Sequence, residues 1–158
     1  MIVNVETIFK IDYDKFIDLI DQPELLMHVA SPLMKFIPVG FKAFPKRWEE
    51  KTYPVKLKVF GVIPFGEHNI VIEKIKKDSL TEYVLRDNGF GKIIKRWDHW
   101  ILIKRIGNNI QYIDRIDIKA GILTFFVYIF TNIFYRWRQM KWKKLIKYGF
   151  KGLQKDPN

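Results

Sequence analysis

The sequence has no cysteine, and it is poor in the other residue types that most often carry chemistry. Without cysteine there is no disulfide framework, no thiolate nucleophile and no Cys-ligated metal. The three histidines, His28, His68 and His99, stand far apart and show no paired ligand spacing, so we predict no metal site. The only serines, Ser31 and Ser79, lie in turn-like contexts, which argues against a serine triad. No stretch carries the signature of a bound group, and we expect no cofactor.

Long apolar runs are also scarce. The longest, from Ile122 to Tyr135, has 14 residues, includes Thr and Asn, and falls short of the roughly 20 that a membrane-spanning helix needs. The first ten residues alternate apolar and polar side chains and lack the basic and apolar regions of a signal peptide. We therefore expect a cytoplasmic protein in which the long apolar run forms a buried helix.

Acidic residues are missing from one segment of a chain that has 28 Lys plus Arg against 17 Asp plus Glu, a net charge of +11. Eight of the basic residues fall between positions 136 and 155, where there is no acid, so the rest of the chain is nearly balanced. Apolar residues such as Trp137, Trp142 and Leu145 interleave with these charges at helical spacing. The pattern predicts one long helix from about Gly121 to Gly149, apolar first and basic later.

The periodicities along the chain predict an α+β fold. Residues 2–11 alternate as a strand, and two short helices follow, the first capped by Asp12 or Asp14 and the second running from Pro23 to about His28. Between positions 48 and 119 the patterns are those of about five or six consecutive antiparallel strands. The whole sheet then has about six to seven strands, and its apolar face must be buried. We expect it to curve around the long terminal helix and grip it.

Glycine-rich stretches mark the expected turns. Gly61–Gly66 separates two strands, and a strand over Leu80–Leu85 is followed by a turn at Asp87–Gly91. Neither glycine stretch precedes a helix whose N-terminus could complete a phosphate site. Both are therefore interpreted as plain turns between strands.

The last two strands of the sheet carry the most informative pattern. Alternation places Trp97, His99, Ile101 and Ile103 on one face of the first strand, and Tyr112, Asp114, Ile116 and Ile118 on one face of the second. If the turn within Gly107–Asn109 contains two residues, His99 and Asp114 point inward together, whereas a three-residue loop would break this parity. Such a pair could orient a ligand, act as a general base, or only satisfy two buried polar groups, and the sequence leaves these roles open.

The terminal helix offers more surface than one sheet can cover. Its first half is apolar almost all round, and we expect Ile129, Ile133 and Trp137 among its contacts with the sheet. The short helices, a bound ligand, lipid or a second subunit in a homodimer could cover the rest. The basic half is a solvated face by default, but Arg138, Lys143, Lys144 and Lys147 could also meet an anionic membrane surface. Nucleic acid is not favoured, because only charge argues for it.

Five short motifs resemble a known superfamily. They are Pro64-Phe-Gly-Glu-His68, Gly89-Phe-Gly91, Arg96-Trp-Asp-His99, Tyr112-Ile-Asp114 with Ala120-Gly121, and Phe134-Tyr-Arg-Trp-Arg-Gln139. With the element order they resemble an uncharacterised bacterial branch of the SRPBCC or START-like superfamily, which has the helix-grip fold and includes polyketide cyclases and lipid-transfer domains. The likeness covers nearly the whole chain, which we take as a single domain over residues 1–158. Trp137 and Met140 depart from the pattern, because more basic residues are expected there.

The resemblance implies a cavity between sheet and terminal helix that holds a hydrophobic or amphipathic small molecule, and it implies no single reaction. The candidate ligand-binding residues are His99, Asp114, Trp97, Tyr112, Ile129 and Ile133. One alternative is an enzyme of the cyclase or hydrolase type with His99 and Asp114 as acid and base, although the shortage of nucleophiles weighs against it. The other is a protein that works at a membrane surface through its basic helix, although no acylation or spanning signal supports strong anchoring.

Overall fold

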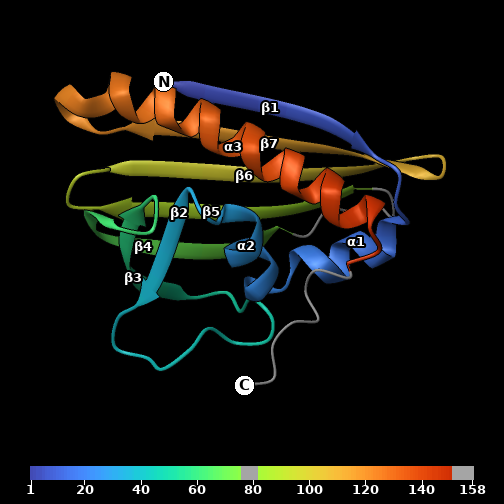
Figure 1. Cartoon of the computed structure of the whole chain (residues 1–158), viewed down its shortest axis with the longest axis horizontal. Coiled ribbons are helices and arrows are strands. Elements are labelled where there is room, and N and C mark those ends of the chain that lie inside the picture. The colour runs from blue at the N-terminus through green and yellow to red at the C-terminus, as the bar shows by residue number, and fades with distance from the viewer. Residues whose placement is uncertain (76–81, 151–158) are drawn as a thin grey trace.

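The computed structural model describes residues 1–75 and 82–150 and places them around one curved antiparallel sheet (Figure 1). The strands are β1 (Ile2–Phe9), β2 (Met34–Pro38), β3 (Thr52–Val59), β4 (Ile63–Ile75), β5 (Glu82–Gly91), β6 (Arg96–Ile106) and β7 (Asn109–Lys119). The helices are α1 (Tyr13–Ile20), α2 (Pro23–Ala30) and α3 (Thr124–Lys147), with a short 3₁₀ turn at Gly121–Leu123 before α3. The strand order is β1-β7-β6-β5-β4-β3-β2, so the first strand lies at one edge of the sheet and pairs with the last strand.

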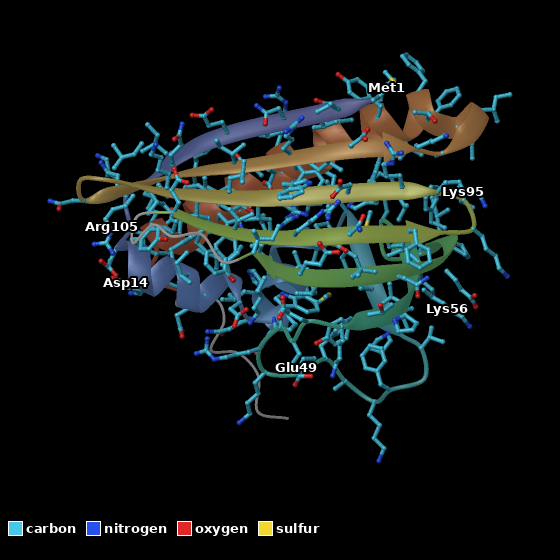
Figure 2. All side chains as sticks on the ribbon, turned by 180° about the vertical axis from the view of Figure 1, so that it is seen from behind. Met1, Asp14, Glu49, Lys56, Lys95 and Arg105 are labelled. Carbon is cyan, nitrogen blue, oxygen red and sulfur yellow. The ribbon has the colours of Figure 1, made fainter. Side chains whose placement is uncertain are left out.

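The three helices lie on one side of the sheet, the side nearer the viewer in Figure 1, whereas Figure 2 shows the opposite face. The side chain of Asp12 caps α1 by accepting a hydrogen bond of 2.9 Å from the backbone N–H of Lys15. Phe16, on the inner side of α1, packs edge-on against Trp142 of α3, with ring centroids 5.1 Å apart. This ring contact joins α1 to α3.

The long helix α3 crosses the concave face of the sheet, as the sequence predicted, and this confirms the α+β helix-grip fold. Its buried side chains recur at helical spacing and are Val127, Thr131, Phe134, Tyr135, Arg138, Gln139, Trp142 and Leu145. Among residues 1–75 and 82–150, no helix has the length and apolar character required to cross a membrane.

The predicted contacts of α3 with the sheet were wrong for three residues. Ile129 and Ile133 face outward, with 43% and 56% of their surface exposed. Trp137 is half-buried, and its indole N–H donates to the backbone carbonyl of Ser31, at the end of α2, rather than to the sheet. Because the first half of the helix is apolar on every side, its composition could not identify which side meets the sheet.

One predicted turn is too long and the other is wrong: the turn between β3 and β4 includes only Gly61 and Val62 of the Gly61–Gly66 stretch, and Asp87–Gly91 lies within a strand. Residues from Ile63 belong to β4, which pairs with β3 across a bulge next to Leu57, and Asp87–Gly91 completes β5. The prediction also missed β2, a five-residue edge strand that pairs only with β3 and ends at a proline. The expected strand start at Leu80, and Lys151 and Lys155 of the basic segment, lie outside the described residues.

A glycine is required in β5 because β4 approaches it closely. A Cβ atom built on Gly91 would lie 2.5 Å from the backbone carbonyl oxygen of Glu67, a distance that no real Cβ tolerates. We therefore expect Gly91→Ala to lower the free energy of unfolding by about 1 to 3 kcal/mol, as for other overpacked sites. Urea denaturation of both proteins measures this cost, and an unchanged midpoint would show that the strands separate without strain.

Candidate ligand pocket

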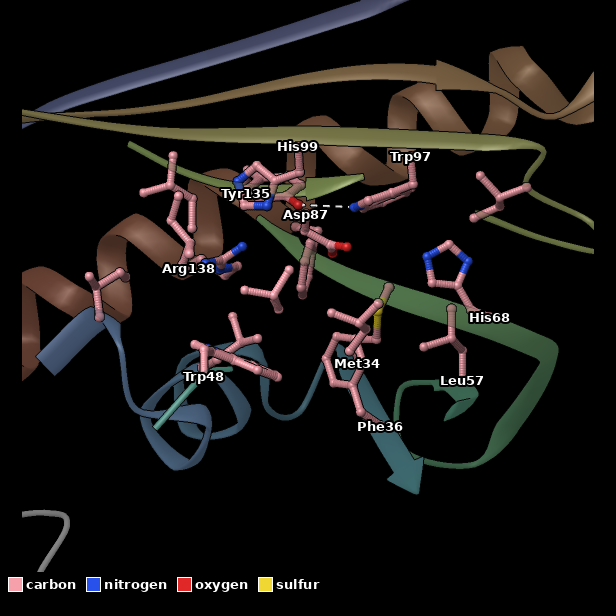
Figure 3. Close-up of a pocket in the computed structure, with 18 residues that line it drawn as sticks. Met34, Phe36, Trp48, Leu57, His68, Asp87, Trp97, His99, Tyr135 and Arg138 are labelled. Carbon is pink, nitrogen blue, oxygen red and sulfur yellow. Dashed lines mark hydrogen bonds between the residues drawn. The ribbon is translucent and has the colours of Figure 1, made fainter. Parts of the chain in front are cut away.

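A narrow pocket lies between the concave face of the sheet and α3 (Figure 3). Its volume is about 50 Å³. Eighteen residues line it: Ile20, Leu26, Met34, Phe36, Trp48, Leu57, His68, Ile70, Ile72, Leu85, Asp87, Ile94, Trp97, His99, Ile101, Phe134, Tyr135 and Arg138. Most of this wall is apolar, and the few polar side chains come from β4, β5, β6 and α3.

His99 and Asp114 meet inside the fold, as the sequence predicted for a two-residue turn. Ile106 pairs with Asn109, so the turn consists of Gly107 and Asn108, and His99 and Asp114 share the buried face. His99 Nε2 lies 2.8 Å from Asp114 Oδ1. Both side chains are buried, at 4% and 0% exposed. The length of the turn therefore determines that His99 and Asp114 share a face, because it sets the register of the two strands.

Asp114 is the centre of a buried hydrogen-bond network rather than part of the pocket wall. Besides its contact with His99, its Oδ1 accepts from the Tyr112 hydroxyl at 2.9 Å, and its Oδ2 accepts from Gln139 Nε2 at 3.0 Å. Gln139 Nε2 also donates to the backbone carbonyl of Val5 in β1 at 2.8 Å. The network links β1, β6, β7 and α3, which gives the pair a structural role whether or not a ligand binds.

The protonation states in this network follow from burial and nearby charge. Burial alone would raise the pKa of Asp114, but the charge of Arg138 and the hydrogen bonds from His99 and Gln139 outweigh it and lower that pKa. Burial lowers the pKa of His99, against the opposing effect of Asp114. A neutral His99 beside an ionised Asp114 must donate from Nε2, so its Nδ1 carries no proton and is an acceptor.

The predicted site residues did not include His68 and Asp87, which are polar residues of the pocket wall. Burial lowers the pKa of His68 to about 4, so it is neutral at pH 7. Burial raises the pKa of Asp87 to about 7, although the backbone N–H of Val71 donates to its Oδ1 at 2.9 Å. Alternation already placed His68 with Ile70 and Ile72, and that signal could have identified it, whereas Asp87 was assigned to a turn.

Arg138 is the largest correction to the predicted site residues. It was expected on a solvated basic face, but it is 2% exposed and reaches from α3 into the pocket (Figure 3). The rings of Tyr135 and Phe134 lie beside its guanidinium, with centroids 4.8 and 5.8 Å from Cζ. Burial opposes its charge, but Tyr112, Asp114 and Tyr135 outweigh that effect and raise the pKa of Arg138. It is therefore charged inside the fold.

The remaining predicted residues are divided between the pocket and the surface. Trp97 lines the pocket, and its indole N–H donates to the Tyr135 hydroxyl at 3.2 Å (Figure 3). Tyr112 lies behind the wall in the Asp114 network, whereas Ile129 and Ile133 lie outside the pocket, on the outer face of α3. The three predicted surface lysines, Lys143, Lys144 and Lys147, are exposed.

The comparisons with known proteins identify the fold. No family model matches the chain, and a search of curated proteins found no relative. Among solved structures, TTHA0849 from Thermus thermophilus is similar over 94% of this chain and 99% of its own, with a TM-score of 0.62 and 8% identity. A START superfamily protein from Mycobacterium smegmatis is similar over 92% of this chain and 97% of its own, with a TM-score of 0.58 and 7% identity. Chr148 from Cytophaga hutchinsonii is similar over 90% and 93%, with a TM-score of 0.51 and 13% identity. The chain therefore has the START-like fold that its motifs resemble.

Proposed function

We propose that this protein binds a hydrophobic or amphipathic small molecule in the pocket between the sheet and α3. The observation that supports this most is the wall itself, which is mainly apolar but brings together His68, Asp87, His99 and Arg138. Ligand pockets typically combine such a surface with a few polar groups that fix the orientation of the bound molecule. A purely structural core would have no need of so many ionisable side chains at one place.

The pocket must widen to admit such a molecule. Its volume of about 50 Å³ is far below the roughly 300 to 1,000 Å³ of typical ligand sites. Part of the wall comes from the short helix α2 and the edge strand β2, through Leu26, Met34 and Phe36. A five-residue edge strand and an adaptable Met side chain can shift at low cost, so we place the widening there.

Native mass spectrometry of freshly purified protein tests the proposal by looking for a co-purifying small molecule. Titration with N-phenyl-1-naphthylamine, a neutral apolar dye whose fluorescence rises in sites that exclude water, tests it independently. Met34→Trp should fill the pocket and weaken dye binding by at least about 10-fold, the effect of losing about 1.4 kcal/mol. The matched control is Lys35→Trp, because Lys35 is the next residue of β2 and is exposed. Equal dye binding by both variants would contradict the proposal.

The same pocket could serve the cyclase- or hydrolase-type alternative, with the neutral His99 as its base. Its Nδ1 is unprotonated, and Asp114 fixes the tautomer by accepting from Nε2. Conversion of a co-purified compound by the wild type but not by His99→Gln would support this alternative. If His99→Gln loses binding of the compound and the wild type does not convert it, the result would support a role for His99 in orienting the ligand.

A second candidate function, docking on an anionic membrane, is supported by the outer face of α3. Exposed apolar side chains occupy its N-terminal half, after Ile122 in the preceding 3₁₀ turn, and exposed basic ones occupy its C-terminal half: Phe125, Phe126, Ile129 and Ile133, then Arg136, Lys143, Lys144 and Lys147. Helical geometry places those from Phe125 onward on one stripe. Apolar side chains that enter the lipid interface and lysines that meet anionic headgroups are the two features of such a surface.

Reversing Lys143, Lys144 and Lys147 to Glu is expected to weaken co-sedimentation with phosphatidylserine-containing vesicles by at least about 100-fold. Each basic residue near an anionic surface contributes about 1 kcal/mol, and the reversal adds repulsion. The control variant reverses Lys56, Arg115 and Lys119, exposed residues on strands, and changes the net charge equally. An equal loss of co-sedimentation in both triple variants would mean that only the net charge matters. Equally strong binding of the wild type to neutral vesicles would exclude an electrostatic contribution.

A further inference from the structure

One edge of the Arg138 guanidinium has no hydrogen-bond partner within the part of the chain that the structure describes. Both Nε and Nη2 are buried, and neither has an acceptor among the described residues. These two nitrogens lie side by side on the same edge of the planar group, and their N–H bonds point in parallel. Two parallel donors of this kind match the two oxygens of a carboxylate. The unpaired edge belongs to a side chain of the pocket wall (Figure 3).

Other donors occupy both oxygens of Asp114 and one oxygen of Asp87, the acidic side chains near Arg138. Asp114 Oδ1 accepts from His99 and Tyr112, and its Oδ2 accepts from Gln139. Asp87 Oδ1 accepts from the backbone N–H of Val71. Asp114 therefore balances the charge of Arg138 without hydrogen-bonding to its free edge. A buried donor left without a partner is costly, and a ligand that supplies the acceptor removes that cost.

We propose that the pocket binds a monocarboxylic acid with an apolar body, and that its carboxylate bridges Nε and Nη2 of Arg138. This inference rests on the proposed ligand-binding function and specifies the chemical class of the ligand. The apolar body lies along side chains such as Ile70, Ile72 and Ile101 of the sheet. The carboxylate contributes two charge-assisted hydrogen bonds in a site that water does not reach, where such bonds are strong.

The same surroundings select against other headgroups. Asp114 is an ionised acid close enough to lower the cost of the Arg138 charge, so a phosphate dianion would meet one cation and at least one anion. An amine would be repelled by the guanidinium. An alcohol or an ester presents one strong acceptor oxygen and no charge to the two parallel N–H bonds, so it pairs with them less strongly than a carboxylate does. A single planar carboxylate is the group that pairs both nitrogens and adds one negative charge.

Competition by ten-carbon compounds against the neutral dye tests this inference. Decanoate, decanol and decylamine have ten carbons and methyl decanoate adds one methyl group, so the four compounds differ chiefly in the headgroup. We choose about pH 6, where decanoate is ionised and Asp87, with a pKa of about 7, is mostly neutral. Decanoate should bind about 10- to 100-fold more tightly than decanol, as two charge-assisted bonds imply. Decylamine should bind most weakly.

Variants of Arg138 test whether the preference comes from the guanidinium edge. The ratio of decanol to decanoate dissociation constants should fall to about 1 in Arg138→Gln and to an intermediate value in Arg138→Lys, which keeps the charge but not the paired donors. Lys119→Gln, an exposed change on β7 that also removes one positive charge, should keep the wild-type ratio. If Arg138→Gln does not fold, the wild-type series and Arg138→Lys decide the matter.

The outcomes separate this inference from the proposed function. If the dye and decanol bind but decanoate binds no more tightly, the carboxylate inference is overturned and the proposed function stands. A decanoate preference that persists in Arg138→Gln also overturns the inference. If neither the dye nor any ten-carbon compound binds the wild type, both fall together.

Discussion

The Asp87→Asn variant is expected to gain stability relative to the wild type as the pH rises from about 4 to about 8. Burial raises the pKa of Asp87 from 3.8 in the unfolded chain to about 7 in the folded protein. Below both values the side chain is protonated in both states, and its contribution to stability is fully present. Between them the unfolded chain releases a proton that the folded protein retains, so this stability is lost as the pH rises. At about 1.4 kcal/mol per pKa unit, the loss approaches about 4 kcal/mol near pH 8.

Urea denaturation of both proteins across this pH range measures the effect. Asparagine resembles the neutral acid, and its Oδ1 can still accept from the Val71 N–H, so the variant lacks only the titration. Asp117→Asn is a control of opposite sign, because the hydrogen bond from Arg96 lowers the pKa of Asp117. That variant should lose stability relative to the wild type as the pH rises from about 2 to about 5, so the control is measured over this more acidic range, and the difference stays constant above it. If the free energies of unfolding of Asp87→Asn and the wild type change with pH in parallel, the pKa of Asp87 is the same in the folded and unfolded states, and the prediction is wrong.

The part of the site that the sequence predicted depends on strand geometry. Strict alternation in β6 and β7, together with a two-residue turn, determines that His99 and Asp114 share a face, and local residues suffice to infer both. The same holds for His68, which alternates with buried isoleucines in β4. The side chains on a strand can face in only two directions, so a pattern of polar and apolar residues identifies the buried face directly.

The helical part of the site was harder to predict, because a helix offers many faces. The first half of α3 is apolar all round, so its pattern does not indicate the face that the sheet covers, and Ile129 and Ile133 were misplaced. The second half does carry a signal: Trp142 and Leu145 are buried, and Arg138 lies four and seven residues before them on the same face. The surrounding lysines hid this signal, because a basic segment as a whole suggests a solvated surface.

The glycine-rich end of β5 was misassigned for a different reason. Gly89 and Gly91 suggested a turn, but they are glycines because β4 leaves no space for a side chain. A Cβ on Gly89 would lie 2.7 Å from His68 Nε2, a contact between strands that local sequence cannot reveal. The missing side chains leave room for the His68 ring at the pocket wall, and β5 continues through Asp87 to Gly91.

Asp114→Asn is expected to destabilise the fold by about 3 to 5 kcal/mol at pH 7, the typical cost of removing one partner of a buried charge pair. The change leaves the buried guanidinium of Arg138 without its compensating charge, although an asparagine can keep part of the hydrogen-bond network. The free energy of unfolding in urea measures this cost. A loss of less than about 1 kcal/mol would mean that solvent or relaxation already screens Arg138.

The double variant Asp114→Asn with Arg138→Met should recover part of this loss, because replacing both charges removes the penalty that one unpaired charge imposes. Together with Arg138→Met alone, the four proteins form a double-mutant cycle that isolates the coupling between the two side chains. Strong coupling would assign Asp114 the role of stabilising a buried arginine. If the double variant also folds well but no longer prefers decanoate over decanol, then the role of Arg138 is to bind the ligand, and the role of Asp114 is to stabilise the charge of Arg138. Additive losses in the cycle would contradict this order, because each residue would then stabilise the fold without the other.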